Sequence, residues 1–178
     1  MARCALVGIA LAIGVASGGV GFVYSGRADV SALSPHWRAT SWALSTAMEH
    51  AVRRRAALLD PPDDVADADR LKRGAVSFDA MCSGCHGAPG VEPDAAGKGL
   101  YPAPPDLIER AADWSVAELF WITKNGVRMT GMPAFGPTHD DETLWEIAGF
   151  VTRLPGLSPS AYRALAATTE VRSHRHSH

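Results

Sequence analysis

At residues 81–87 the chain reads Met-Cys-Ser-Gly-Cys-His-Gly, which contains a C-x-x-C-H motif. This motif is the attachment signature of a c-type haem. Two thiols three positions apart at the end of a helix, those of Cys82 and Cys85, can reach the two vinyl groups on one edge of a porphyrin. The next residue, His86, is then directed to the iron. The motif therefore predicts a haem attached through Cys82 and Cys85, with His86 as its proximal ligand.

Two other chemistries also use closely spaced cysteines. A thioredoxin-like C-x-x-C requires a βαβ context, whereas the residues that flank this motif are helical in pattern and rich in glycine. A zinc site needs further ligands nearby, and the sequence places no second cysteine pair or histidine cluster in the same domain. The three cysteines of the chain are too few for a disulfide scaffold or a four-thiolate site. The motif therefore favours haem attachment.

A haem iron in an electron carrier needs a sixth ligand, and residues 126–136 offer two thioethers, Met129 and Met132. Met132 is the preferred candidate, because Pro133 fixes the backbone after it and Gly131 lets the chain lie close to a porphyrin. Met129 is the alternative ligand; otherwise it packs beside the haem. Ligation by a histidine and a methionine raises the reduction potential relative to a site with two nitrogen ligands.

Residues 68–168 resemble a class I c-type cytochrome, and specifically the bacterial membrane-anchored members with a single haem. The resemblance rests on four segments, residues 82–87, 99–107, 130–135 and 144–151. It implies an all-α fold in which a small set of helices wraps one covalently bound haem c. It also implies that Cys82 and Cys85 form the thioethers, that His86 is the proximal ligand of the iron, and that Met132 is the distal one.

Residues 65–169, the expected haem domain, carry helical patterns of their own. The apolar spacing predicts an amphipathic helix over residues 69–81 that leads directly into the C-x-x-C-H motif, with Leu71, Ala75 and Phe78 facing inward. Capping residues and helix breakers predict further helices from Ser115 to Gly126, from Asp140 to Leu154 and from residue 159 to residue 169.

Several polar or aromatic groups are candidates for contact with the haem. Residues 101–105 contain three prolines and cannot be helical. The resemblance identifies them as the loop whose backbone carbonyl accepts the Nδ1–H of the proximal histidine. Lys98 and Arg128 are either propionate partners or exposed cations, and Trp121 lies on the haem or reaches a propionate through its indole N–H.

Residues 1–24 are expected to form a transmembrane anchor or a signal peptide. Residues 5–24 carry no charge, and a helix of that length reaches roughly 30 Å, which is enough to cross the hydrocarbon core. The apolar run is longer than that of an ordinary signal peptide and has no clean cleavage site, which favours an anchor. The count of flanking arginines would place the rest of the chain in the cytoplasm. Covalent haem attachment, which the resemblance places on the other side of the membrane, overrules that count.

Residues 25–64 are expected to be a linker that contains one amphipathic helix. The apolar residues Trp37, Leu44, Met48, Val52 and Leu59 recur at helical spacing between residues 36 and 59, and the Asp-Pro-Pro sequence at residues 60–62 ends the pattern. The Arg-Arg-Arg run at residues 53–55 is interpreted as a solvated, positively charged helix end, or alternatively as a contact with anionic lipid headgroups.

The net charge of −2 conceals an uneven distribution. Residues 1–59 carry a net charge of +4, residues 60–160 carry −8, and residues 161–178 carry +2. The overall charge excludes the basic field that nucleic-acid binding requires. The acidic domain either attracts a basic patch on a partner protein or simply remains soluble. The histidine-rich tail, residues 170–178, is expected to be a frayed terminus, with metal binding as the alternative.

These features predict a one-electron carrier rather than an enzyme. The resemblance implies a haem domain that faces the periplasm of a bacterium, held by a single pass through the inner membrane. The expected redox partners are a dehydrogenase or a terminal oxidase of the same membrane. A haem subunit of a larger oxidoreductase complex is the alternative. A peroxidase-like or ligand-binding haem protein is a weaker alternative, because His139 is the sole further histidine between residues 65 and 169.

Overall fold

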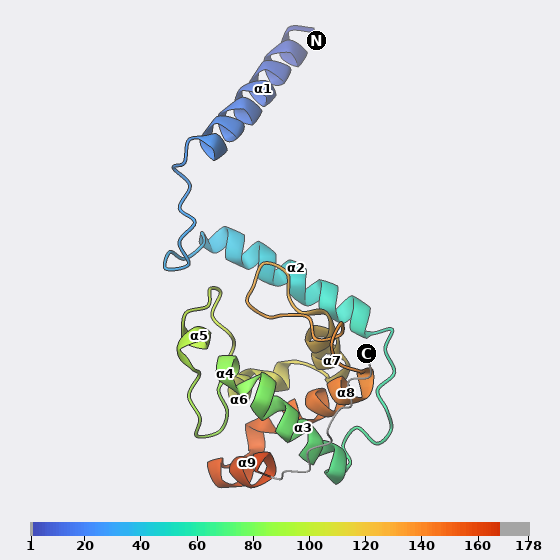
Figure 1. Ribbon diagram of the computed structural model, residues 1–178. Coiled ribbons are helices and arrows are strands. Elements are labelled where there is room, and N and C mark those ends of the chain that lie inside the picture. Colours follow the sequence, from blue (N-terminus) through green and yellow to red (C-terminus); the bar gives the residue numbers. More distant parts are fainter. Residues whose placement is uncertain (1, 168–178) are drawn as a thin grey trace, which may run out of the picture. The chain divides into compact units, whose positions relative to one another are not determined.

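The computed structural model describes residues 2–167 (Figure 1). Within them the secondary structure is helical, apart from one isolated bridge between Ala88 and Val91. The predicted all-α fold is therefore confirmed. The helices, in chain order, are α1 (Ala2–Tyr24), α2 (Arg38–Ala56), α3 (Ala68–Met81), α4 (Ser83–His86), α5 (Ala95–Lys98), α6 (Leu107–Arg110), η1 (Ala111–Asp113), α7 (Val116–Asn125), α8 (Asp141–Val151), η2 (Leu154–Gly156) and α9 (Pro159–Ala166). The histidine-rich tail lies outside the described residues.

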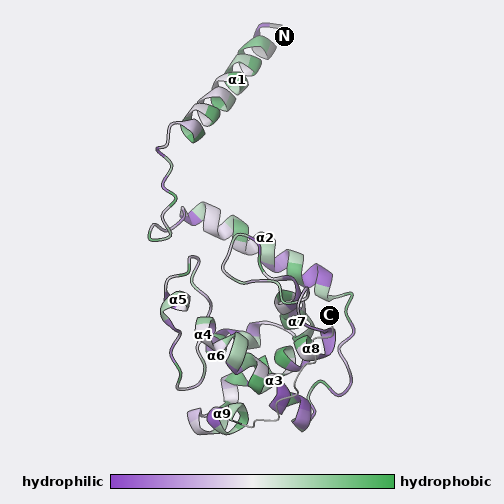
Figure 2. Ribbon diagram, in the orientation of Figure 1, coloured by the Kyte–Doolittle hydropathy of each residue, from purple (hydrophilic) through white to green (hydrophobic). Residues whose placement is uncertain are grey.

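The chain divides into two compact units, Met1–Pro35 and His36–His178. The first unit contains α1, which includes the uncharged run of residues 5–24 that the sequence predicts to be helical. Its segment Leu6–Tyr24 has a mean hydropathy of 2.2, and none of it is buried within the protein. Figure 2 shows the apolar residues distributed around this helix. By length and composition α1 can cross a membrane, and a signal sequence near an N-terminus has the same properties.

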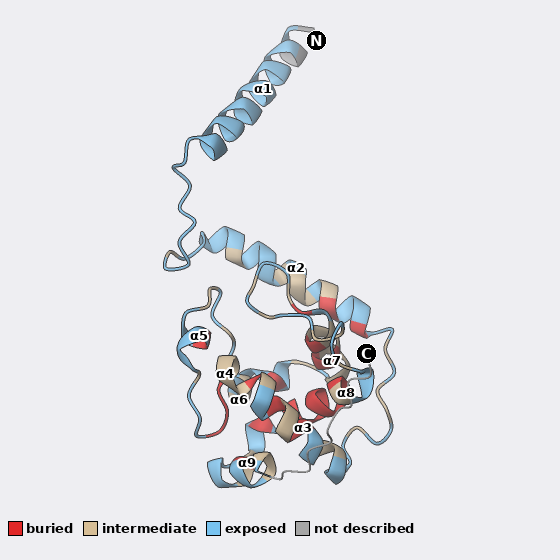
Figure 3. Cartoon of the chain, viewed as in Figure 1, coloured by how far each residue is buried: buried red, intermediate tan, exposed pale blue. Residues whose placement is uncertain are grey.

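The second unit begins at His36, and its first helix is α2. The C-terminal half of α2 packs on α7, and Val52 and Ala56 are buried in that contact. The N-terminal half is largely exposed (Figure 3). Trp37 lies before the helix and is 85% exposed, so it does not belong to the packed stripe. The last two turns of α2 therefore pack within the second unit, and its first turns are exposed.

The core of the second unit is built on the crossing of α3 and α8 (Figure 1). Gly74 of α3 lies directly against the backbone carbonyl of Glu146 in α8, where any larger side chain would collide with it. Near this crossing the rings of Phe78 and Phe150 are 5.5 Å apart. Ala75 and Phe78 are fully buried, as the sequence predicts. The close helix crossing thus sets the position of the C-terminal end of α3, where the C-x-x-C-H motif begins.

Helix α7 covers a second side of α8. Its N-terminus is the capping box of Ser115 and Glu118, which confirms the predicted N-cap, and it ends before Gly126 at a φ of 66°. The ring of Phe120 stacks on that of Trp145 at 3.8 Å between centroids. Residues Leu144 to Val151 of α8 are all buried, because α3 and α7 cover different sides of that helix.

Helix α9 packs against α3 through Tyr162, which is 1% exposed. The Tyr162 hydroxyl donates a 2.6 Å hydrogen bond to the carboxylate of Asp79 on α3. The Ser158 side chain caps the helix by accepting a hydrogen bond from the backbone N–H of Ala161. Through this contact α9 lies against the C-terminal part of α3, which leads into the C-x-x-C-H motif.

Candidate haem site

The C-x-x-C-H motif forms a separate turn at the end of α3. Cys82 is both the C-cap residue of α3 and the N-cap residue of α4. Its carbonyl accepts hydrogen bonds from the backbone N–H groups of Cys85 and His86, at 3.1 and 2.9 Å. The three residues therefore lie on one helical turn, which is the placement that thioether attachment requires. Both thiols are free.

The two thiols differ in their surroundings. Cys82 is 8% exposed, whereas Cys85 is only partly buried. Burial, and to a lesser degree the neighbouring Cys85, raise the pKa of the Cys82 thiol to about 12. Burial therefore favours the protonated form of the free Cys82 thiol, which lies on the apolar side of the turn.

The backbone of the motif is supported by α5. A Cβ atom at Gly97 would lie 2.7 Å from the carbonyl oxygen of Gly84 and 2.8 Å from the Cα of Cys85. The side chain of Asp94 caps α5 by accepting the N–H of Gly97, and the Asp94 N–H donates to the Gly84 carbonyl at 2.8 Å. Neither Asp94 nor Gly97 belongs to a motif that marks it in the sequence. An Asp three residues before a Gly in a short polar loop is the available sequence signal.

The His86 ring is held by the proline loop. Its Nδ1 lies 2.9 Å from the backbone carbonyl of Pro105. A carbonyl can only accept, so Nδ1 carries the hydrogen and Nε2 keeps its lone pair. Burial lowers the pKa of His86, and the hydrogen bond to Pro105 opposes that effect. A neutral imidazole with a fixed tautomer is the form that binds iron. The resemblance implies that a carbonyl of this loop accepts the Nδ1–H, and in the structure this acceptor is the carbonyl of Pro105.

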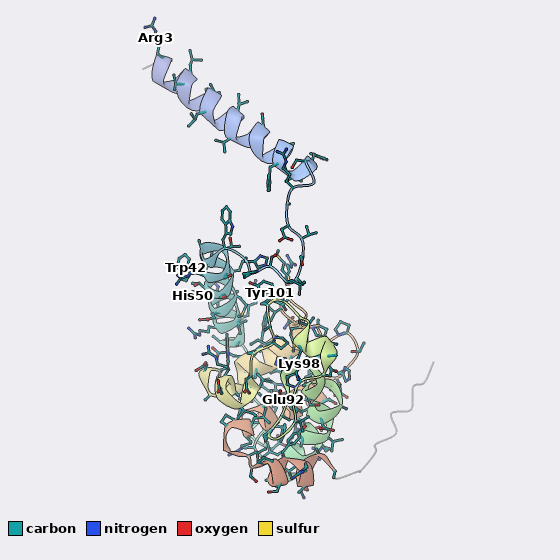
Figure 4. The ribbon with its side chains drawn as sticks, turned by 90° about the vertical axis from the view of Figure 1, so that its left-hand side faces the viewer. Arg3, Trp42, His50, Glu92, Lys98 and Tyr101 are labelled. Carbon is teal, nitrogen blue, oxygen red and sulfur yellow. The ribbon has the colours of Figure 1, made fainter. Side chains whose placement is uncertain are left out.

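The same loop contacts the segment that carries the two candidate methionines. The side chain of Leu100 lies so close to Gly131 that a Cβ atom there would be 2.6 Å from it. The hydroxyl of Tyr101 accepts the backbone N–H of His36 at 2.8 Å, and Figure 4 shows Tyr101 near the start of α2. The proline loop thus connects the histidine, the methionine segment and the beginning of the second unit.

The methionine segment folds back onto the end of α7. The carbonyl of Met132 accepts the N–H of Val127 at 3.2 Å, and the Met132 N–H donates to the Thr130 hydroxyl at 3.1 Å. Gly126 lies so close to this segment that a Cβ atom would be 2.8 Å from the Met132 carbonyl. Met132 is partly buried, whereas Met129 is 75% exposed. Of the two thioethers, that of Met132 is the more sheltered.

The other candidates have partners within the protein or remain exposed. Lys98 lies 3.7 Å from Glu92 (Figure 4), and Arg128 is exposed. The ring of Trp121 lies beneath the Arg55 guanidinium, 5.7 Å from its centroid, so this part of the arginine run faces α7. The ring nitrogen of His139 lies 2.9 Å from the adjacent Thr138 hydroxyl. Among residues 2–167, no three His, Cys, Asp or Glu side chains gather as a metal site.

The donor set fits a covalently attached haem, since it combines two unlinked thiols with one neutral imidazole on a single turn. Residues 69–151 match the family model described as cytochrome c oxidase, cbb3-type, subunit III. The match extends from α3 to the end of α8 and includes the motif, the proline loop and both methionines. No curated protein and no solved structure matches the chain. The chain therefore contains a c-type cytochrome domain, whose cofactor is a covalently bound c-type haem.

Proposed function

We propose that this protein is a membrane-anchored one-electron carrier with histidine–methionine ligation. In this proposal Cys82 and Cys85 form the thioethers, His86 is the proximal ligand and Met132 the distal one. The domain match supports haem-based electron transfer in general. The hydrogen bond between His86 Nδ1 and the Pro105 carbonyl carries the finer assignment, because it reserves Nε2 for a metal. When bound, the haem supplies one-electron chemistry at its iron.

The residues of the chain would contribute orientation and exclusion of water. The Pro105 carbonyl holds the proton on His86 Nδ1, so the ring keeps one orientation in both oxidation states. Thr130 and Val127 hold the backbone of Met132 by hydrogen bonds, which limits its movement. The buried side chains around Cys82 exclude water from that side of the motif. A low-polarity, rigid environment of this kind raises the potential and keeps rearrangement on electron transfer small.

We further propose that α1 anchors the domain in the bacterial inner membrane, with the haem on the periplasmic side. The length and hydropathy of Leu6–Tyr24 support the anchor, and covalent haem attachment outside the cytoplasm supports the orientation. The domain between residues 60 and 160 has a net charge of −8, which suits a partner that presents a basic surface.

A subunit role is the second candidate, because the matched family is described as a subunit of an oxidase. In that case the partner is a membrane oxidase complex rather than a succession of diffusing proteins. Native gel electrophoresis of the full chain in mild detergent distinguishes the two roles. A subunit migrates together with the membrane oxidase complex, whereas an independent carrier migrates alone.

Carbon monoxide binding to the reduced, full-length protein tests the ligand assignment. We expect a low-spin spectrum that carbon monoxide does not change, because Met132 occupies the sixth position. Met132→Ala should then bind carbon monoxide rapidly. Met129→Ala is the matched control and should behave as the parent protein, since Met129 is 75% exposed. Carbon monoxide binding by the parent protein, or by the Met129 variant alone, would refute the assignment.

A further inference from the structure

Two of the five tryptophans differ from the other three in their surroundings. Trp145 stacks on Phe120 in the core, and Trp114 and Trp121 each lie beneath an arginine of α2. Trp37 and Trp42, in contrast, are 85% and 70% exposed. These two indoles lie within five residues of each other at the start of α2, and together they leave a large apolar area in contact with water.

The position of these tryptophans in the chain restricts what can cover them. Residues 25–36 separate Trp37 from Tyr24, the last residue of α1. At about 3.5 Å per residue, this segment holds Trp37 within about 45 Å of the end of α1, whatever path it takes. If α1 is a membrane anchor, the bilayer surface is therefore present at a high effective concentration beside the start of α2.

The charges around the two tryptophans suit a membrane surface better than those elsewhere in the domain. No Asp or Glu occurs between residues 30 and 48, and Arg38 follows Trp37 directly. Residues 60–160 carry a net charge of −8, so that part of the domain would be repelled by anionic lipid. The start of α2 is thus an apolar, weakly basic end on an acidic domain.

We infer that the start of α2 is a second membrane contact, in which Trp37 and Trp42 lie in the headgroup region of the bilayer that holds α1. Indole rings favour this region because they combine an apolar body with a polar N–H. Arg38 extends its guanidinium to lipid phosphates. This inference rests on the proposed membrane anchoring. It adds that the start of α2 faces the bilayer.

A membrane contact at the start of α2 would also restrict the movement of the haem domain, because α2 is packed against it. Val52 and Ala56 at the other end of α2 are buried against α7. His36, immediately before Trp37, is joined to Tyr101 by a 2.8 Å hydrogen bond and an edge-on ring contact. A start of α2 held at the lipid surface would therefore hold the rest of this unit in one orientation relative to the bilayer. A free tether would allow all orientations equally.

Site-specific photo-crosslinking tests this inference in the full-length holoprotein. p-Benzoylphenylalanine replaces Trp37, Trp42, Leu11 or Leu58 in turn, and each variant is reconstituted in vesicles of phosphatidylcholine and phosphatidylglycerol. Leu11 lies in α1 and reports the anchor. Leu58 is the matched control, because it is apolar and 87% exposed but follows α2 and precedes Asp60. An unchanged haem spectrum verifies the fold of each variant, and mass spectrometry measures the lipid adducts.

We expect lipid adducts at Trp37 and Trp42 several-fold above those at Leu58, together with adducts at Leu11. Adducts at Leu11 with none above the Leu58 level at either tryptophan would overturn the second contact and leave the anchor intact. Absence of adducts at all four positions would overturn both proposals. Adducts between two protein chains at Trp37 or Trp42 would assign this surface to a second copy instead of lipid.

Discussion

At the scale of single residues, the size of the side chain at some positions is limited by the space between neighbouring elements. Gly97 packs on the backbone of the motif, between Gly84 and Cys85. Tyr162 is buried, and its hydroxyl meets Asp79 near the end of α3. Neither residue is in the C-x-x-C-H motif, but Gly97 lies against its turn and Tyr162 binds the helix that leads into it.

Gly97→Ala should reduce haem attachment and stability. The added methyl group would meet two backbone atoms at 2.7 and 2.8 Å, which cannot move aside without displacing Cys85. We expect a loss of about 1–3 kcal/mol in the free energy of unfolding and a lower ratio of haem to protein. Gly99→Ala is the control, because its Cβ would meet the nearest atom at 3.4 Å. Equal effects of the two substitutions would contradict the close contact.

Tyr162→Phe should change how stability depends on alkaline pH. Burial, followed by the hydrogen bond to Asp79, raises the pKa of Tyr162 above its ordinary value of 10.0. In the unfolded chain this phenol loses its proton near pH 10, whereas in the folded protein it keeps it, so unfolding becomes more favourable as the pH rises further. We therefore expect the parent protein to lose stability above pH 10 more steeply than the variant. Denaturation between pH 8 and pH 11 measures this, and parallel curves would contradict it.

At the scale of elements, α2 shows how a helix with a predicted apolar stripe is used unevenly along its length. Its last two turns pack on α7, where Arg53 also lies over Trp114 and within 3.9 Å of the Glu118 carboxylate. Its first two turns remain exposed. The element is therefore packed on α7 at one end and exposed at the other.

Val52→Ala tests whether α2 contributes to the stability of the domain. Val52 is 1% exposed, so loss of its buried methyl groups should lower the free energy of unfolding by about 1.5–3 kcal/mol. Leu58→Ala, at an 87% exposed position, should change it by less than about 0.5 kcal/mol. Chemical denaturation followed by haem absorption measures both. A free linker helix would make the two variants indistinguishable from the parent.

At the scale of the whole molecule, charge is uneven along the chain, and the basic residues of α2 belong to the same compact unit as the acidic residues 60–160. Residues 1–59 carry +4 and residues 60–160 carry −8. The individual ion pairs, such as Lys124 with Asp141, are mostly exposed and add little stability. The net field of the domain, however, acts over about a Debye length, roughly 10 Å at 0.1 M salt.

Electron transfer should therefore depend on salt with a sign set by the charge of the redox reagent. We expect the rate of oxidation by a small cationic cobalt complex to fall as ionic strength rises, because screening removes attraction to the acidic domain. The rate with ferricyanide, an anion, should rise over the same range. Stopped-flow absorption measures both with the full-length protein. Salt-independent rates would show that the acidic charge lies away from the electron-transfer surface.

The amino-acid sequence alone determined the features that depend on short-range chemistry. Cys82, Cys85 and His86 lie on one helical turn. Their spacing in the sequence therefore predicts that their side chains lie close together, without any knowledge of the fold. The helices α3, α7 and α8 follow from periodicity and from capping residues such as Ser115, which also act locally. The uncharged run that became α1 is equally visible in composition.

The tertiary structure decided the contacts between residues distant in the chain. Three contacts depend on how the loops fold back. Pro105 accepts the hydrogen bond from His86, Leu100 covers Gly131, and Gly97 lies on Cys85. Polar loops carry no periodic signal that specifies such pairings. The packing of α2 is of the same kind, because an apolar stripe shows that a helix has a face to bury but not which partner buries it. In the structure α2 packs on α7, and α7 packs in turn on α8.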